Sequence, residues 1–247
     1  MKKLLLGAVT LFAVACAEKP MDIQPENIEF WEVCESATTG ELYNFFYNGE
    51  ADKLVAEAFE QEPGNQFSSL LVREYPYKDR KGKIQSTMVG GYIVAAAEKK
   101  NMEAINNLLA LEGVKEKIAG DVKLAWSNKN SLDGTRGGIY TLYALQGNGG
   151  LVPSMDGSGI VEAKAVSGQY GGFEVSIVMN SKAAAEWANL TEKNVGKPLA
   201  IVMDNVVYSA PLVNGRIDGG HSSITGAFTK SEAEAFARAL NHRALNQ

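Results

Sequence analysis

The fold is decided by the stretch LAIVMDNVVY, residues 199–208 of a chain of 247 residues. Residues 199–203 form a continuous apolar run, which is typical of a strand that is buried on both faces. Asp204 and Asn205 follow, and Asn tolerates the positive φ that a tight hairpin turn requires. The apolar pattern then returns from Val206 to Tyr208. The stretch therefore predicts two antiparallel strands joined by a two-residue turn.

The segments on either side of this hairpin predict a further strand and two helices. Apolar and polar residues alternate over 173–179, which is the period of a strand with one buried face. Asn180 can cap a helix that carries Trp187, and Thr229 with Glu232 forms a capping box that opens the last helix. The order strand, helix, strand, strand, helix predicts an α+β fold in which an antiparallel sheet packs against helices.

The first half of the chain has weaker signals. Apolar residues spaced three and four apart predict two short helices around residues 42–46 and 54–59, separated at Asn48-Gly49. Strands are expected at 67–72, 88–97, 122–126 and 139–145, and Asn101 is expected to cap a further helix. Glycines cluster at residues 147–150 and 157–159, and such density is typical of a linker. We therefore expect an N-terminal α+β region over residues 27–150 and a C-terminal domain over residues 151–247.

The N-terminus has the order of a secretory signal. Lys2 and Lys3 precede twelve apolar or small residues, Leu4 to Ala15, which Cys16 follows. A bilayer of about 30 Å needs roughly twenty residues, so residues 1–15 are expected to be a signal peptide that is removed. Ala13-Val14-Ala15 fits the consensus before a lipidated cysteine except that Ala13 replaces the usual Leu, and it predicts lipidation of Cys16 and a tether over residues 16–26. The alternative is ordinary cleavage nearby, with Cys16 left free or paired with Cys34.

Composition and motif spacing give no reason to expect catalysis. The net charge is −5 and Lys and Arg form no large cluster, which argues against a nucleic-acid partner. His221 precedes Ser222, but the Gly-x-Ser-x-Gly motif of serine hydrolases is missing because Ile224 occupies the final position. Metal-ligand spacings and phosphate-binding loops are not found either. The sequence predicts no catalytic, cofactor-binding or metal-binding residues, no cofactor, and a structural core position for Cys34.

The segment from Phe173 to Leu240 resembles the translocase subunit SecD and the fused SecD-SecF proteins. The resemblance is carried by GKPLAIVMD at residues 196–204, SAP at 209–211, ITGAFT at 224–229 and EA at 232–233. In that family these blocks belong to the head of the first periplasmic domain. The resemblance implies a head-like domain over residues 151–247, and residues 27–150 are similar to part of the base of the same periplasmic domain.

The resemblance implies a role in protein export, without the proton-relaying membrane helices that drive the full-length family. We expect a non-catalytic module on the periplasmic side of the cell envelope, anchored to a membrane by lipid at Cys16. Its expected partners are unfolded or translocating polypeptide, or the Sec translocase. The alternative is a repurposed envelope lipoprotein that serves as a protein–protein adaptor, because one fold can carry different functions. A polypeptide binder accepts many unfolded chains, whereas an adaptor accepts one folded partner.

Overall fold

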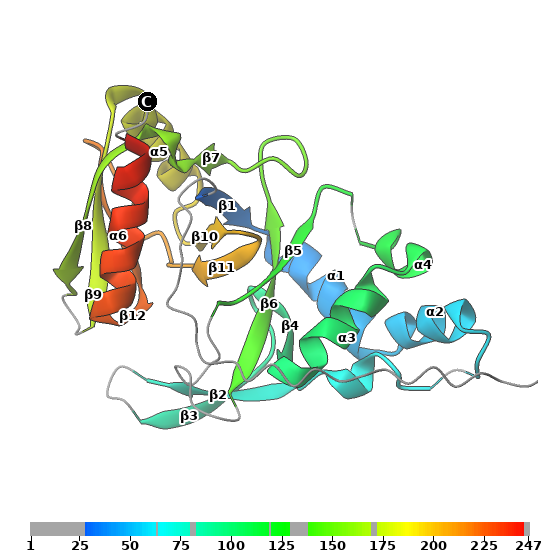
Figure 1. Ribbon diagram of the computed structural model, residues 1–247. Coiled ribbons are helices and arrows are strands. Elements are labelled where there is room, and N and C mark those ends of the chain that lie inside the picture. The colour runs from blue at the N-terminus through cyan, green and yellow to red at the C-terminus, as the bar shows by residue number, and fades with distance from the viewer. Residues whose placement is uncertain are drawn as a thin grey trace, which may run out of the picture.

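The computed structural model describes residues 28–62, 64–79, 83–118, 120–128, 138–168 and 172–244. The predicted signal peptide, the tether and Cys16 lie outside these residues. Figure 1 shows a three-stranded sheet with helix α6 at one end of the molecule, a larger sheet in the middle, and helices α1–α4 at the other end.

The larger sheet combines strands from both halves of the chain. Its strands are β1 (Glu29–Val33), β4 (Ile93–Glu98), β5 (Lys123–Trp126), β6 (Ile139–Gln146), β7 (Met155–Asp156), β10 (Leu199–Met203) and β11 (Val206–Ser209). The order is β11-β10-β1-β6-β4, β5 also pairs with β6, β7 also pairs with β1, and these pairs are antiparallel. Strand β1 therefore lies between β10 and β6, although it begins the described chain.

The larger sheet curls back on itself at the end of β5. Asn128 N donates to Val207 O at 2.7 Å, next to a bridge between Ser127 and Val207. The ring of β11, β10, β1, β6 and β5 encloses a small apolar cluster, formed by Trp31, Val33, Ala125, Leu145, Ala200, Val202 and Val207. Alternate residues of β10 point the other way into a second core, so this strand is buried on both faces, as its apolar run predicts.

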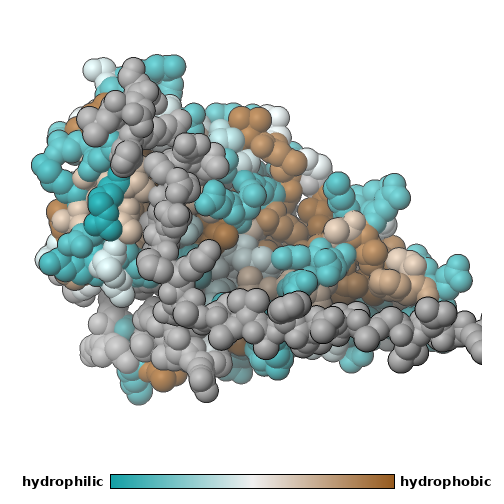
Figure 2. Space-filling model, in the orientation of Figure 1, coloured by the Kyte–Doolittle hydropathy of each residue, from teal (hydrophilic) through white to brown (hydrophobic). Residues whose placement is uncertain are grey.

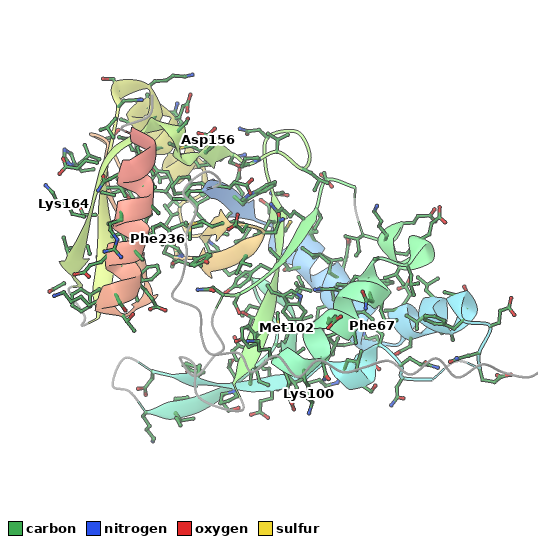
Figure 3. All side chains as sticks on the ribbon, in the orientation of Figure 1. Phe67, Lys100, Met102, Asp156, Lys164 and Phe236 are labelled. Atoms are coloured by element: carbon green, nitrogen blue, oxygen red, sulfur yellow. The ribbon has the colours of Figure 1, made fainter. Side chains whose placement is uncertain are left out.

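The second sheet has the order β12-β9-β8 and packs against the last helix. Its strands are β8 (Ile160–Ser167), β9 (Phe173–Met179) and β12 (His221–Phe228), and β9 is antiparallel to both neighbours. Helices α5 (Ser181–Lys193) and α6 (Lys230–Ala244) complete this unit. Figure 3 shows Phe236 of α6 turned toward the strands, where its ring is fully buried. The predicted α+β class with an antiparallel sheet and packed helices is confirmed.

The predicted turn and caps in this unit are also confirmed. Asp204 and Asn205 have φ values of 49° and 63°, which is the geometry of a tight hairpin turn. Asn180 accepts a hydrogen bond from Ala183 N at 2.9 Å at the start of α5. Thr229 N donates to Glu232 Oε2 at 2.7 Å and Glu232 N donates to Thr229 Oγ1 at 3.3 Å, which completes the capping box.

The first half of the chain forms a third core against β4, β5 and β6. Its helices are α1 (Ser36–Tyr47), α2 (Glu50–Ala58), α3 (Lys99–Leu109) and α4 (Glu112–Lys115), with a 3₁₀ turn η2 (Ser68–Leu70). Gly49, with φ of 85°, separates α1 from α2 at the predicted position. Phe67, labelled in Figure 3, is buried in this core, and so is Cys34, which confirms its structural position. Strands β2 (Glu74–Lys78) and β3 (Ile84–Met88) form a separate hairpin.

Three local predictions for this half are wrong. Residues 67–72 are not a strand, because the buried Asp52 carboxylate accepts hydrogen bonds from Phe67 N and Ser68 N at 2.7 and 3.1 Å and stabilises the start of η2. The strand expected at 88–97 is divided by Gly90 and Gly91, whose φ values are 155° and 65°. Asn101 does not cap α3, since its side chain donates to Leu70 O at 3.0 Å while α3 begins at Lys99.

The glycine-rich segment after residue 146 is the loop between β6 and β7. Leu151 and Val152 in this loop are largely exposed, and Figure 2 shows hydrophobic residues at the surface there. The larger sheet and the core of the C-terminal unit both include residues from before and after this segment, because Ile28, just before β1, and Phe30 of β1 lie in one core with Leu199 and Ile201 of β10. The division at residue 150 stays a prediction.

Candidate functional site

A cavity of about 490 Å³ lies in the C-terminal unit, between the second sheet, helix α5, strand β10 and the loop of residues 210–220. Its volume is in the range of about 300–1,000 Å³ that is usual for ligand sites. The apolar part of its lining is formed by Phe30, Ile177, Trp187, Leu199, Ile201, Pro211, Leu212, Val213, Ile217 and Ile224. The polar part includes Thr191, Ser222, Ser223 and Thr225. The lining is thus mainly apolar, with a few hydroxyl groups.

The loop of residues 210–220, here called the covering loop, is held at its first end by backbone hydrogen bonds. Leu199 N donates to Pro211 O at 3.1 Å, Val213 N donates to Lys197 O at 3.0 Å, and Gly196 N donates to Val213 O at 2.9 Å. These bonds extend the start of β10 as a short ladder. The first half of the covering loop is therefore a fixed wall of the cavity.

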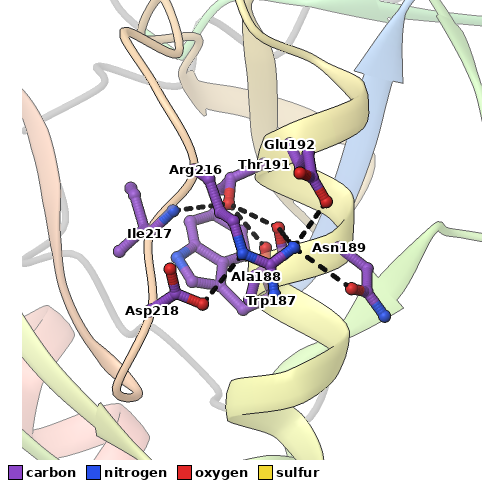
Figure 4. A network of polar contacts seen from close by, with 8 residues as sticks. All are labelled: Trp187, Ala188, Asn189, Thr191, Glu192, Arg216, Ile217 and Asp218. Carbon is purple, nitrogen blue, oxygen red and sulfur yellow. Dashed lines mark hydrogen bonds and ion pairs between the residues drawn. The ribbon is translucent and has the colours of Figure 1, made fainter.

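The second half of the covering loop is attached to helix α5 through Thr191, as Figure 4 shows. The Thr191 hydroxyl accepts a hydrogen bond from Ile217 N at 3.0 Å and donates to Trp187 O at 2.8 Å. Thr191 is fully buried, so no solvent competes with its hydroxyl for these hydrogen bonds. One side chain thereby joins the helix to the loop.

Arg216 makes further contacts at the surface beside Thr191. Its Nη1 lies 2.5 Å from Glu192 Oε2 and its Nε lies 2.9 Å from Asp218 Oδ1. The hydrogen bond to Asp218, with the charges of both carboxylates, raises the pKa of Arg216 above its ordinary value. The guanidinium is matched by two carboxylates, so it gives the mouth of the cavity no net positive charge.

The segment that anchors the covering loop is also linked to the first half of the chain. Lys197 Nζ lies 2.5 Å from Glu35 Oε1, and this hydrogen bond lowers the pKa of Glu35 and raises the pKa of Lys197. Tyr92 Oη donates to Gly196 O at 3.2 Å. Both contacts lie at the surface, so they position the segment more than they stabilise the fold.

Trp187 is the most unusual residue of the cavity. Its side chain is 7% exposed and its ring meets that of Phe30 edge-on, with 5.0 Å between the centroids. Its Nε1 is buried and, within the described part of the chain, has no hydrogen-bond acceptor. Figure 4 shows this nitrogen on the side of the ring that faces the covering loop. An unsatisfied buried donor costs about 1–3 kcal/mol, so an acceptor that entered the cavity would gain a strong partner.

The serine and histidine residues near the cavity do not form a hydrolytic pair. Side chains of neighbouring residues on a strand point to opposite faces, which separates His221 from Ser222. Ser223 shares the exposed face with His221, but its hydroxyl donates to Glu174 Oε2 at 2.8 Å. Among the residues that the structure describes, no group of three or more His, Cys, Asp or Glu is placed to hold a metal ion.

The cavity was not predicted from the sequence, which placed Trp187 on a helix and proposed only Cys16 as a modified residue. One signal could have pointed to it. Gly219 and Gly220 both have positive φ, and a Cβ on Gly220 would lie 2.8 Å from the Ala184 Cβ. The glycine pair at the end of the covering loop therefore reflects a close approach of this loop to helix α5.

Comparison with known proteins relates this unit to one family. The profile of the family described as SecDF, P1 head subdomain, matches residues 145–247. Residues 145–247, here called the P1 head, are therefore similar to that subdomain. The cavity, except for the wall that Phe30 supplies, lies within this P1 head.

Similar proteins include the protein translocase subunit SecD of Rhodothermus marinus, which is 46% identical over 91 residues, or 37% of this chain and 15% of that protein. SecD of Leptotrichia buccalis is 41% identical over 91 residues, or 37% of this chain and 22% of that protein. The protein translocase subunit SecDF of Thermus thermophilus is 36% identical over 93 residues, or 38% of this chain and 13% of that protein. The P1 head is thus similar to part of these translocase subunits. The matched part is less than a quarter of the length of each of them.

Two solved structures were compared with the whole chain. One, titled "Structure and function of a membrane component SecDF that enhances protein export", is 17% identical with a TM-score of 0.35, and covers 87% of this chain and 92% of that chain. The crystal structure of SecDF in the super-membrane-facing form is 17% identical with a TM-score of 0.36, and covers 92% of this chain and 30% of that chain. Scores this low carry no weight for the fold, which follows from the strand pairing. Within the described residues, no helix is long and apolar enough to cross a membrane.

Proposed function

We propose that this chain is a non-catalytic module of the cell envelope whose P1 head assists protein export by binding unfolded or translocating polypeptide. The binding site is the cavity beside Trp187. An apolar side chain of the client fills the cavity, and a backbone carbonyl of the client accepts a hydrogen bond from Trp187 Nε1. Backbone recognition of this kind tolerates many client sequences, as a binder of unfolded chains requires.

The observation that carries this proposal is the buried indole N–H without an acceptor in a cavity of about 490 Å³. A residue that served only the core would need no free donor, because an apolar side chain can be buried without the cost of an unsatisfied group. The fixed covering loop supports the same interpretation, because a preformed site loses little conformational entropy on binding.

The proposed location is the periplasmic side of a membrane, with lipid at Cys16 as the anchor and the Sec translocase as a neighbour. Replacement of Cys16 by Ser should move the protein from the membrane fraction to the soluble fraction. A wild-type protein that is already soluble would show that there is no anchor.

The test of the binding site uses the chain without residues 1–15 and with Cys16→Ser. It is titrated into a fluorescently labelled, reduced and unfolded exported protein, and the folded form of the same protein is the control. We expect a dissociation constant on the order of micromolar or weaker, because the client must be ordered on binding. Salt should change it little, since the charges at the cavity mouth are already paired.

Trp187→Phe is the matched variant, because it removes the N–H and keeps an aromatic ring. It should weaken binding by about two- to tenfold, which corresponds to one lost hydrogen bond. The free energy of unfolding is measured alongside, because the smaller ring loses packing while the removal of an unsatisfied donor acts in the opposite direction. Equal affinity of the two proteins would exclude the cavity as the site. Preference for the folded form would favour the adaptor.

A further inference from the structure

The hairpin of β2 and β3 stands apart from both larger sheets. Figure 1 shows it projecting below the rest of the molecule, and among the described residues neither of its strands pairs with a third strand. A two-stranded hairpin is marginally stable by itself, and three or more strands are usually needed for a stable sheet. The hairpin therefore offers two free edges.

The hydrogen-bond pattern shows which backbone groups face these edges. Val89 N donates to Arg73 O at 2.8 Å and Asp79 N donates to Lys83 O at 3.0 Å, at the two ends of the register. Bonded and non-bonded pairs alternate in an antiparallel ladder, so the pairs 74–88, 76–86 and 78–84 are the non-bonded ones. The N–H and C=O groups of Ile84, Ser86 and Met88 consequently point outward from β3.

The two edges differ in their protection. Pro76 lies in a non-bonded pair of β2, so the position without an N–H is on the outer edge of that strand. Proline at such a position is a common means of blocking an edge. Strand β3 reads Ile-Gln-Ser-Thr-Met, without proline or charge, and no strand of the described residues pairs with its outer edge.

The solvent-facing side chains of β3 are apolar at both ends. Ile84 and Met88 are each 60% exposed, and they lie on the same face as Ser86 between them. Figure 2 shows hydrophobic residues at the surface over this hairpin. An antiparallel copy of β3 centred on Ser86 would place Ile84 opposite Met88 of the second chain, and Met88 opposite Ile84. The strand is thus complementary to itself in both backbone and side chains.

We propose that β3 is a dimerisation edge, which pairs antiparallel with β3 of a second copy of this chain around a two-fold axis at Ser86. The product is a four-stranded sheet in the order β2-β3-β3-β2, and each outer edge is a β2 edge that carries Pro76. Assembly therefore stops at two copies. This inference does not depend on the polypeptide-binding function, since the hairpin contributes no residue to the cavity.

Ser86→Pro tests the proposal with little damage to the hairpin. It removes an N–H that faces outward and leaves the bonds between β2 and β3 in place, whereas the control Ser86→Ala keeps the N–H. Two symmetry-related hydrogen bonds are lost in the dimer, so Ser86→Pro should raise its dissociation constant by about thirtyfold. Sedimentation equilibrium over a range of concentrations, in a Cys16→Ser background, measures this constant for all three proteins.

Disulfide trapping gives a second measurement that does not need a proline variant. Directly opposed bonded residues have Cα atoms about 5.5 Å apart, which a disulfide can span. In the Cys16→Ser background, Ser86→Cys should therefore form a covalent dimer under mild oxidation, whereas Ser158→Cys, on the remote loop after β7, should not. A monomeric wild type together with no trapping at residue 86 would overturn the proposal. A monomer in which Ser86→Pro weakens the binding of unfolded polypeptide would overturn it too, because the edge would then be a client site.

Discussion

The attachment of the covering loop to helix α5 can be tested by replacing Thr191 with Val. Valine has nearly the shape of threonine but lacks the hydroxyl that accepts from Ile217 N at 3.0 Å. Because Thr191 is fully buried, no solvent can replace it and the Ile217 N–H is left without an acceptor. Such a loss costs about 1–3 kcal/mol in the free energy of unfolding. For a chain of this size, a loss of about 2 kcal/mol corresponds to a decrease of about 4–8 °C in the melting temperature.

Arg216→Ala is the informative comparison, because Arg216 makes more polar contacts with the same region. Its partners Glu192 and Asp218 have side chains that are 63% and 68% exposed, and ion pairs between exposed groups contribute about 0–1 kcal/mol. The burial of a residue should therefore matter more for stability than the number of its polar contacts. Thr191→Val should lower the free energy of unfolding more than Arg216→Ala does.

The assay is urea unfolding of both variants and the wild type, followed by circular dichroism. Thr191→Ser, which keeps the hydroxyl and loses one methyl group, should cost about 1 kcal/mol through packing alone. Two results would contradict this prediction. One is that Arg216→Ala lowers the free energy of unfolding at least as much as Thr191→Val does. The other is that Thr191→Val changes it by less than about 0.5 kcal/mol, which is the usual range for surface substitutions.

Two further predictions concern the hairpin turn and the buried thiol. Asn205 has φ of 63°, so Asn205→Val should destabilise by about 1 kcal/mol or more, while Asn205→Gly should be neutral or slightly stabilising; thermal melts that coincide would contradict this. Burial, with a smaller contribution from Asp121, raises the pKa of Cys34 from 9.0 to about 11, so the stability that its protonation provides is complete below pH 9 and is lost as the pH rises toward 11. Urea unfolding in a Cys16→Ser background measures this effect. Between pH 8.5 and 11, the free energy of unfolding should fall by about 2 kcal/mol less in Cys34→Ala than in the protein that keeps Cys34. An equal fall in both proteins would exclude this role of the thiol.

The elements of the P1 head could be predicted where local and long-range signals agree. The alternating strand β9, the cap at Asn180, the hairpin at Asp204-Asn205 and the capping box at Thr229 are all fixed by residues close in sequence. Strands β8 and β12 were not predicted, because apolar and polar residues do not alternate regularly along either of them.

The errors in the first half have a common cause. Asp52 controls the backbone at Phe67 and Ser68 from a helix that is distant in sequence, and Asn101 bonds to Leu70 instead of to its own helix. Tertiary contacts of this kind outweigh local propensity and leave no periodic pattern. The cavity escaped prediction for a similar reason, because a buried tryptophan has the same pattern whether or not its N–H has a partner.

The position of β1 has a consequence for how the protein folds. Phe30 pairs with Ile201 and lines the P1 head cavity, although the two residues come from opposite ends of the described chain. Contacts between such distant segments form late, because the intervening chain must be ordered before they are made. As the polypeptide emerges from the ribosome, β1 has no strand partner in β10 until β10 has been synthesised. A fragment limited to residues 145–247 would lack β1, so it should expose Leu199 and Ile201 and fold poorly when expressed alone.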